Sequence, residues 1–196
     1  MLLVGFGYKA RQGKNTAAHA FLEQCPLESE ARFFAFADAL RAEVTKAVRQ
    51  YKTEAALISA WKESGLMPDW VRPELGKART LYQWWGTDFR RAQDPDYWIK
   101  RLFATFTKIK PDTALVTDVR FPNEADAILA AGGYLVKVTR LGKPDIVVHE
   151  HPSERALDGY NRWTHELTAA TVDELKKKTL ALYREIERKH GNNSRT

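Results

Sequence analysis

The feature that most constrains the fold is the segment Met1 to Ala18, MLLVGFGYKARQGKNTAA. Its apolar run from Leu2 to Phe6 is typical of a central parallel strand that is buried on both faces. A turn containing Gly13 and Lys14 follows, and a helical pattern begins directly after it. A strand, a glycine-containing turn and a helix in this order predict a phosphate-binding loop, in which backbone N–H groups surround a phosphate and a lysine reaches its outer oxygens.

The loop departs from the usual pattern at one position. In G-x-x-x-x-G-K the first glycine precedes the second by five residues, and Tyr8 occupies that slot here, with Gly7 one residue too early. A residue other than glycine resists the positive φ that such a turn uses. We therefore predict that Tyr8 lies at the mouth of the loop without blocking it.

The composition fits one soluble, intracellular domain. A chain of 196 residues can bury a core without disulfides, and its single cysteine, Cys25, belongs to no Cys/His cluster with zinc-ligand spacing. Neither a secretion signal nor an apolar run of about 20 residues is present, which predicts a cytoplasmic protein without a membrane partner. The net charge of +6 admits a nucleic acid or a small polyanion as the partner. Much of the positive charge lies on residues at helical spacing, which is typical of the solvent-exposed face of a helix.

Strands alternate with helices along the rest of the chain. Further apolar segments predict a strand over Phe33 to Phe36 that ends at Asp38, and strands over Ala114 to Val116, Tyr134 to Thr139 and Trp163 to Ala169. This order predicts an α/β fold whose mostly parallel five-stranded sheet is covered on both faces. We expect a single domain over residues 1–190, with a helical or mobile insertion at 52–78, a lid-like loop at 141–158 and a frayed tail at 191–196.

Polar groups follow three of the expected strands, at the edge of the sheet where ligands bind. They are the phosphate-binding loop, Asp38, and Asp118 with Arg120. A carboxylate such as Asp118 suits magnesium or its waters, and a helix or turn cap is the alternative interpretation. The planar guanidinium of Arg120 matches two oxygens of an acceptor phosphate.

Two further patterns each have two interpretations. Trp84 and Trp85, with Asp88 nearby, could provide an aromatic floor for a base, although aromatic residues at helical spacing are more often part of a core. The run of His149, Glu150 and His151 suggests a metal site but lacks a third ligand at a suitable spacing, which favours a polar loop.

Several segments together resemble the deoxynucleoside monophosphate kinases of tailed bacteriophages, a branch of the P-loop nucleoside monophosphate kinases. They are YKARQGKNT, FAFADALR, LYQWWGTDFRR with DPDYWIKRL, VTDVRFPNEADAI with GGYLVKVTR, and HEHPSE. The resemblance implies a P-loop kinase fold with three α/β/α layers. It also implies ATP-dependent phosphorylation of a deoxynucleoside monophosphate to the diphosphate, with Mg²⁺ as cofactor and ATP as co-substrate.

The resemblance, matched position by position to the patterns above, implies the residues of the site, and the roles of Arg41, Arg140 and Arg155 come from the resemblance alone. The catalytic residues would be Lys14, Asp118, Arg120 and Arg140. ATP would be bound by Lys9, Ala10, Arg11, Gln12, Gly13, Lys14, Asn15, Thr16 and Arg155. The acceptor would be bound by Asp38, Arg41, Trp84, Trp85, Asp88 and Arg120. Magnesium would be held by Thr16 and Asp118, directly or through water.

The expected partners are ATP and a deoxynucleoside monophosphate, with no stable nucleic acid, in the host cytoplasm if the chain is encoded by a phage. A homodimer is one option for the assembly. Two other functions stay open: a P-loop kinase of another small acceptor such as dephospho-coenzyme A, and a basic P-loop protein that binds nucleic acid.

Overall fold

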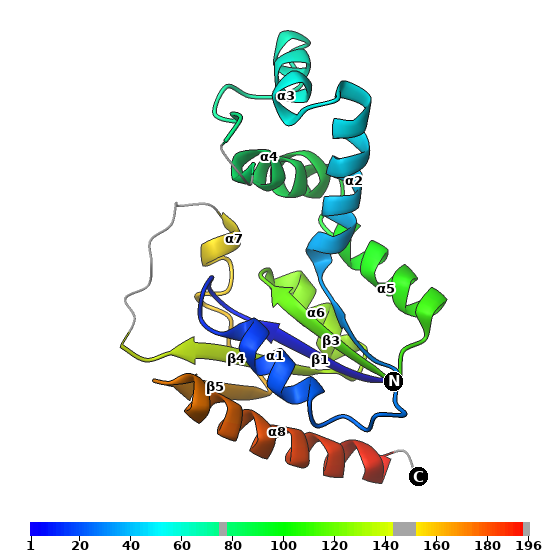
Figure 1. Ribbon diagram of the computed structural model, residues 1–196, viewed down its shortest axis with the longest axis vertical. Helices are drawn as coiled ribbons and strands as arrows, with labels where there is room; N and C mark the ends of the chain where they lie inside the picture. Colours follow the sequence, from blue (N-terminus) through cyan, green and yellow to red (C-terminus); the bar gives the residue numbers. More distant parts are fainter. Residues whose placement is uncertain (75–77, 143–151, 194–196) are drawn as a thin grey trace. The chain divides into compact units, whose positions relative to one another are not determined.

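The structure is a computed structural model that describes residues 1–74, 78–142 and 152–193 (Figure 1). The chain divides into two compact units, which we name the sheet unit and the helical unit. The sheet unit comprises Met1–Ala35 and Ala104–Thr196, and the helical unit comprises Phe36–Phe103. The single domain expected over residues 1–190 stays a prediction.

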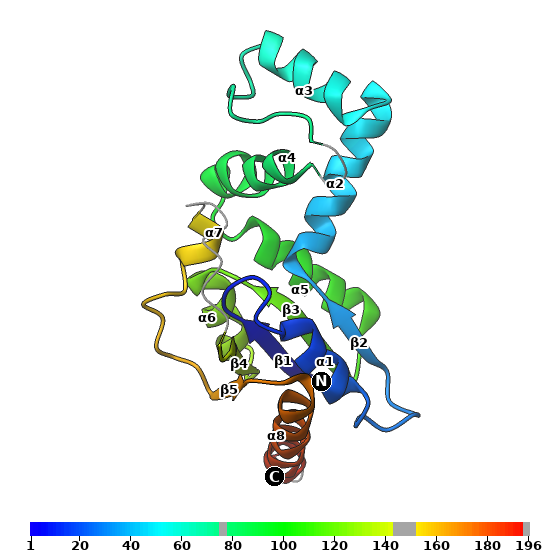
Figure 2. The ribbon, with the colours of Figure 1, turned by 60° about the vertical axis from the view of Figure 1, so that its left-hand side comes forward.

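The sheet unit is built on five parallel strands in the order β2-β3-β1-β4-β5 (Figure 2). They are β1 (Leu2–Gly7), β2 (Ala31–Phe34), β3 (Thr113–Val119), β4 (Tyr134–Arg140) and β5 (His165–Ala169). Because β1 has a neighbour on each side and helices over both faces, its apolar run is continuous. The five-stranded sheet predicted from the sequence is confirmed, and it is parallel throughout.

Helices cover both faces of this sheet. The helices of the sheet unit are α1 (Lys14–Leu22), α6 (Pro122–Ala130), α7 (Pro152–Arg155), α8 (Val172–Asn193) and the second part of α5 (Tyr97–Ile109). Successive residues of a strand point to opposite faces, and Val4 and Phe6 belong to the core that β1 forms with α1 and α8. On the other face, a Cβ at Gly5 would lie 2.5 Å from Ile128 of α6. The predicted α/β/α layering is therefore confirmed.

The final helix extends further than its sequence indicated. Thr171 Oγ1 accepts a hydrogen bond from the N–H of Glu174 at 3.2 Å, and the Glu174 carboxylate accepts one from the N–H of Ala170 at 2.8 Å. The first bond satisfies an N–H group that the first turn of a helix leaves unpaired, and the second ties this turn to the residue before Thr171. The helix runs to Asn193, so residues 191–193 of the segment expected to fray are helical, and 194–196 lie outside the described residues.

The prediction that the second strand ends at Asp38 is wrong. The strand ends at Phe34 and α2 begins at Phe36, so Asp38 lies in the first turn of a helix. Phe36 is buried as a helical residue, and a short apolar run alone does not distinguish a strand from the start of a buried helix. A carboxylate in the first turn is favoured by the helix dipole.

The helical unit, whose helices are drawn in Figure 2, has a core of aromatic side chains. Its helices are α2 (Phe36–Tyr51), α3 (Glu54–Glu63), α4 (Arg79–Gln83), the π-helix η1 (Trp84–Arg91) and the first part of α5. Trp61 stacks on Trp85 with ring centroids 4.9 Å apart, and Trp84 stacks on Phe89 at 5.2 Å. Of the insertion expected at 52–78, residues 75–77 lie outside the described residues. Helix α3 lies within it and begins at Glu54, directly after Thr53, whose hydroxyl accepts the N–H of Ala56 at 3.1 Å.

None of the described helices combines the length and apolar character needed to cross a membrane.

Candidate functional site

The loop between β1 and α1 has an unusual backbone for its sequence. Tyr8, Arg11 and Gly13 have positive φ values of 95°, 59° and 99°. The turn therefore forms at Tyr8 although a side chain stands where a glycine is usual. A left-handed conformation costs a residue with a Cβ roughly 1–2 kcal/mol, so contacts elsewhere must offset this cost.

The ring of Tyr8 makes such contacts within the sheet unit. It packs edge-on against Trp163 with centroids 6.4 Å apart, and the ammonium groups of Lys137 and Lys9 lie 5.0 and 5.3 Å from its centroid. An aromatic pair contributes about 0.5–1.5 kcal/mol and an exposed cation–π contact about 0.5–1 kcal/mol, which is comparable to the backbone cost. A Cβ at Gly7 would lie 2.8 Å from Trp163. Gly7, one residue before the usual glycine position, thus leaves room for the Trp163 ring that packs against Tyr8.

Lys14 is the central side chain of the loop. It is the first residue of α1, it is buried, and its ammonium donates hydrogen bonds to the carbonyl oxygens of Tyr8, at 3.0 Å, and of Lys9. The pKa of Lys14 is lowered to about 8, because burial and the positive charge of Arg120 lower it more than the carboxylates of Glu154 and Asp118 raise it. The predicted residues Asp118 and Arg120 therefore each lie within electrostatic reach of Lys14.

The end of β3 positions Asp118 and Arg120. Gly7 pairs with Val119 in the parallel register of β1 and β3, which brings the residue after β3 beside the start of the loop. The buried Glu124 of α6 fixes the backbone there, because its carboxylate accepts the N–H groups of Arg120 at 2.9 Å and of Phe121 at 3.1 Å. Pro122 begins α6, a position where its missing N–H costs nothing.

Glu154 of α7 is a site residue that the sequence analysis did not identify. One carboxylate oxygen accepts a hydrogen bond from the N–H of Ala10 in the loop at 3.3 Å, and the other lies 2.6 Å from the guanidinium of Arg120. Ala10 and Glu154 are 144 positions apart. The segment HEHPSE was the only signal in the sequence, and it did not indicate what its glutamate contacts.

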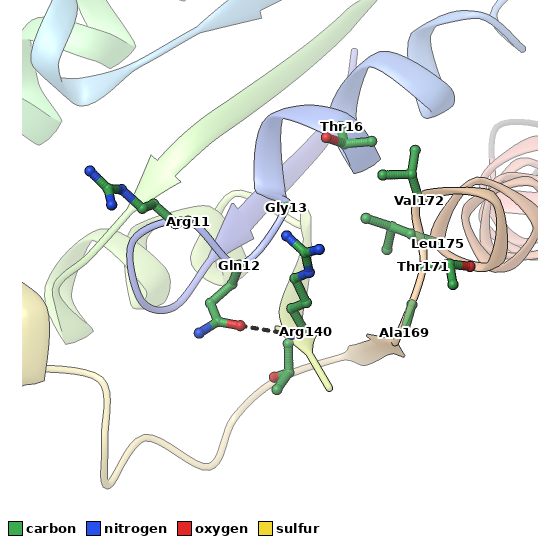
Figure 3. Close-up of a pocket in the computed structure, with 10 residues that line it drawn as sticks. Arg11, Gln12, Gly13, Thr16, Arg140, Ala169, Thr171, Val172 and Leu175 are labelled. Atoms are coloured by element: carbon green, nitrogen blue, oxygen red, sulfur yellow. Dashed lines mark hydrogen bonds between the residues drawn. The ribbon is translucent and has the colours of Figure 1, made fainter. Parts of the chain in front are cut away.

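A cavity of about 70 Å³ lies beside the loop (Figure 3). Arg140 donates its backbone N–H to the side-chain oxygen of Gln12 at 2.7 Å, and its side chain extends toward Gly13. The cavity is at the carboxyl ends of β4 and β5, where ligands bind in parallel sheets. Its lining comprises Arg11, Gln12, Gly13, Thr16, Thr139, Arg140, Ala169, Thr171, Val172 and Leu175.

Three other predicted ATP ligands, Lys9, Asn15 and Arg155, are not part of the lining of this cavity. The ammonium of Lys9 lies 3.3 Å from Asp158, and the guanidinium of Arg155 lies 4.0 Å from the same carboxylate. The side chain of Asn15 is exposed on α1. Of the lid-like loop expected at 141–158, residues 143–151 lie outside the described residues, and they include the three residues of the His-Glu-His run. The ATP-binding roles of Lys9, Asn15 and Arg155 stay predictions.

The other predicted acceptor ligands belong to the helical unit. Asp38 and Arg41 form an exposed ion pair at 3.3 Å, and Asp88 is exposed on η1. Trp84 and Trp85 are both 4% exposed, which gives them a packing role in the aromatic core. Acceptor binding by these five residues stays a prediction.

Magnesium is the cofactor that the resemblance implies. Among the residues that the structure describes, no group of three or more His, Cys, Asp or Glu side chains could hold a metal ion by itself. Kinases bind Mg²⁺ with one or two carboxylates and complete its coordination with phosphate oxygens and water. Asp118, half-buried and interacting with Lys14 at the loop, fits this donor set.

Comparison with known proteins identifies one informative relative. The deoxynucleoside-5'-monophosphate kinase of Escherichia phage T5 is 32% identical to this chain over 124 residues, which are 60% of this chain and 47% of that protein. The chain thus spans about half the length of this relative. The similarity confirms the resemblance to a phage deoxynucleoside monophosphate kinase. No protein-family model matches the chain.

A sugar kinase from Janibacter sp. HTCC2649, solved without ligand, has a TM-score of 0.43 and 12% sequence identity to this chain, with 95% of each chain covered. A TM-score at this level does not establish a shared fold.

Proposed function

We propose that this protein is a kinase that transfers the γ-phosphoryl group of ATP to a deoxynucleoside monophosphate. The observation that carries the proposal is the position of Lys14, at the start of α1 in a glycine-containing loop and within electrostatic reach of Arg120 and Asp118. A loop with a lysine can bind the phosphates of one substrate, and a nearby arginine can bind the phosphate of a second substrate. The phage T5 relative is a deoxynucleoside-5'-monophosphate kinase, which supports the same substrate class.

The proposed reaction is an in-line displacement. An oxygen of the acceptor phosphate forms a bond to the γ-phosphorus, the bond from that phosphorus to the bridging oxygen of ADP breaks, and its electron pair stays on ADP. Negative charge spreads over the transferred group during this step. Lys14 would neutralise part of that charge, and Arg120 would orient the acceptor phosphate.

The cavity beside the loop is our candidate for ATP contacts beyond the reacting phosphates. Thr16 and Gly13 line it from α1 and the loop, and Arg140 lines it from the end of β4. The guanidinium of Arg140 would add positive charge to the donor side. Magnesium would be held by Asp118, directly or through water, and by the hydroxyl of Thr16, and when bound it supplies positive charge to the phosphate oxygens.

A screen of ATP consumption across ribonucleoside and deoxyribonucleoside monophosphates tests the proposed function. We expect turnover with at least one deoxynucleoside monophosphate. Turnover with dephospho-coenzyme A alone would reassign the acceptor. DNA binding with steep salt dependence and no ATP consumption would instead support a nucleic-acid-binding protein.

The acceptor role predicts a specific kinetic effect for Arg120→Ala. We expect the KM for the monophosphate to rise about tenfold or more, because a charge-assisted hydrogen bond contributes about 1.5–3 kcal/mol. The KM for ATP should change little. Initial rates over a grid of both substrates measure the two constants separately.

Arg32→Ala is a matched control for this variant. Arg32 is an exposed arginine of β2, in the same unit, and its guanidinium lies 3.2 Å from Glu30. We expect its kinetic constants to match those of the wild type. If Arg120→Ala changes only the KM for ATP, the assignment of Arg120 to the acceptor is wrong.

The lowered pKa of Lys14 predicts how nucleotide affinity depends on pH. A phosphate anion favours the protonated ammonium, so binding raises the pKa of Lys14 above its value of about 8 in the free protein and takes up a proton. The affinity for ADP should therefore fall as the pH rises above about 8, by up to tenfold per pH unit. Isothermal titration calorimetry from about pH 7 to about pH 10 measures this.

Lys14→Arg provides the comparison, because a guanidinium stays protonated across this range. The affinity of this variant, whatever its value at pH 7, should vary much less with pH. A wild-type affinity that stays constant between about pH 7 and about pH 10 would contradict the interpretation.

A further inference from the structure

The carboxylate of Glu154 is held by groups that a phosphate would use. Its two oxygens contact the N–H of Ala10 in the loop and the guanidinium of Arg120. The same carboxylate interacts electrostatically with Lys14. A backbone N–H of a phosphate-binding loop, an arginine and a lysine are together a set of anion ligands.

Glu154 also bridges the two sides of the proposed reaction. Ala10 belongs to the loop assigned to the donor, and Arg120 is assigned to the acceptor phosphate. The group that lies between donor and acceptor during transfer is the phosphoryl group itself. The carboxylate of Glu154, with a side chain 16% exposed, is in contact with both sides.

A second contact ties the segment after α7 to the loop. The ammonium of Lys9 lies 3.3 Å from Asp158. Beyond this point, Tyr160 donates its hydroxyl to Asp126 of α6 at 2.7 Å, and its carbonyl accepts the indole N–H of Trp163 at 2.9 Å. These bonds anchor the chain that presents Glu154, so the carboxylate is held at the loop by more than its own two contacts.

We propose that Glu154 is an internal anion that occupies the phosphoryl position of the unliganded protein and must leave it before a substrate phosphate binds. The proposal rests on the proposed function for the identity of that phosphate. The affinity of a site that is open for only a fraction of the time is reduced by that fraction. Removing the negative charge of Glu154 should therefore increase the affinity for a phosphate anion.

Binding of magnesium-free pyrophosphate tests this without catalysis. We expect Glu154→Gln to bind pyrophosphate about tenfold more tightly than the wild type, as measured by calorimetry. Glu154→Asp keeps the charge on a side chain that is one methylene shorter and cannot span both contacts, so its affinity should rise by a smaller factor. If Glu154→Gln does not fold, the affinity of Glu154→Asp still tests the proposal.

Glu30→Gln is the matched control, because Glu30 is an exposed glutamate directly before β2 whose carboxylate lies 3.2 Å from Arg32. Its affinity for pyrophosphate should equal that of the wild type. An unchanged or lower affinity in the Glu154 variants would overturn the proposal, as would the absence of pyrophosphate binding in every variant. Lower affinity would indicate that Glu154 positions the loop or Arg120 for the phosphate.

The kinase screen decides the proposed function independently. Tighter pyrophosphate binding by Glu154→Gln, in a protein that consumes no ATP with any monophosphate, would support the internal anion and reject the kinase. Turnover together with unchanged pyrophosphate affinity would support the kinase and reject the internal anion.

Discussion

Replacing Lys14 with alanine is expected to reduce turnover by about 10³-fold or more and to leave the sheet unit folded. Removing a single preorganised donor from a site that stabilises developing charge commonly costs 10²–10³-fold in rate, and Lys14 would also bind the ground-state phosphates. A coupled assay of ADP release at saturating substrates measures the loss. Circular dichroism and thermal unfolding report whether the fold persists.

The stability of Lys14→Ala should differ little from that of the wild type because two effects oppose each other. The variant loses the hydrogen bonds from the ammonium to the carbonyl oxygens of Tyr8 and Lys9. It also loses a buried positive charge whose desolvation is unfavourable, as the lowered pKa of Lys14 indicates. Unchanged activity in a folded Lys14→Ala variant would refute the proposed mechanism.

The architecture of the sheet unit was predictable because its strands are buried on both faces. Such strands need continuous apolar runs, and these runs stand out in a sequence. The position of Asp118 and Arg120 followed from the same reasoning, since a parallel sheet brings the carboxyl ends of its strands to one edge. The second strand was harder to delimit, because the buried Phe36 of α2 continues its aromatic run.

The contacts of the loop could not be predicted in the same way. Tyr8 has positive φ and its ring packs against Trp163, a residue far away in the sequence. Glu154 contacts the loop from an equally distant segment. Local patterns describe how a segment folds, but they contain no information on which distant side chain completes a site. The short motif was therefore recognisable, whereas its supporting residues were not.

Glu43 connects three helices of the helical unit, and Glu43→Ala is expected to destabilise that unit by about 2–3 kcal/mol. Its carboxylate accepts hydrogen bonds from the indole N–H of Trp85 at 3.2 Å, from Arg90 at 2.9 Å and from the hydroxyl of Tyr97. The side chain is only 14% exposed. Alanine would leave three donors without this acceptor in a partly buried place, which costs more than the loss of a surface ion pair.

Hydrogen exchange followed by mass spectrometry measures the effect in each unit separately. Peptides from α2, η1 and the start of α5 should exchange faster in Glu43→Ala, whereas peptides from β1 and β3 should be less affected. Glu63→Ala is the control within the same unit, because Glu63 is exposed on α3 and accepts a hydrogen bond from Ser59. Its effect should stay within about 0.5 kcal/mol. Equal losses of stability in the two variants would show that the hydrogen bonds of Glu43 contribute no more than the contact of an exposed glutamate.

The pH dependence of stability separates the charge of Glu43 from its packing. Burial alone would raise the pKa of this carboxyl group, but hydrogen bonds from Tyr97, Trp85 and Arg90 outweigh burial and lower it. A carboxylate with a lowered pKa stabilises the fold above its unfolded-state value of about 4.3, and this contribution disappears as the pH falls through the lower folded-state value. Glu43→Gln keeps an acceptor of similar size but does not titrate. The helical unit of the wild type should therefore lose more stability than that of Glu43→Gln when the pH is lowered from about 6 to about 3. If both proteins show the same pH dependence, the contribution of Glu43 comes from packing alone.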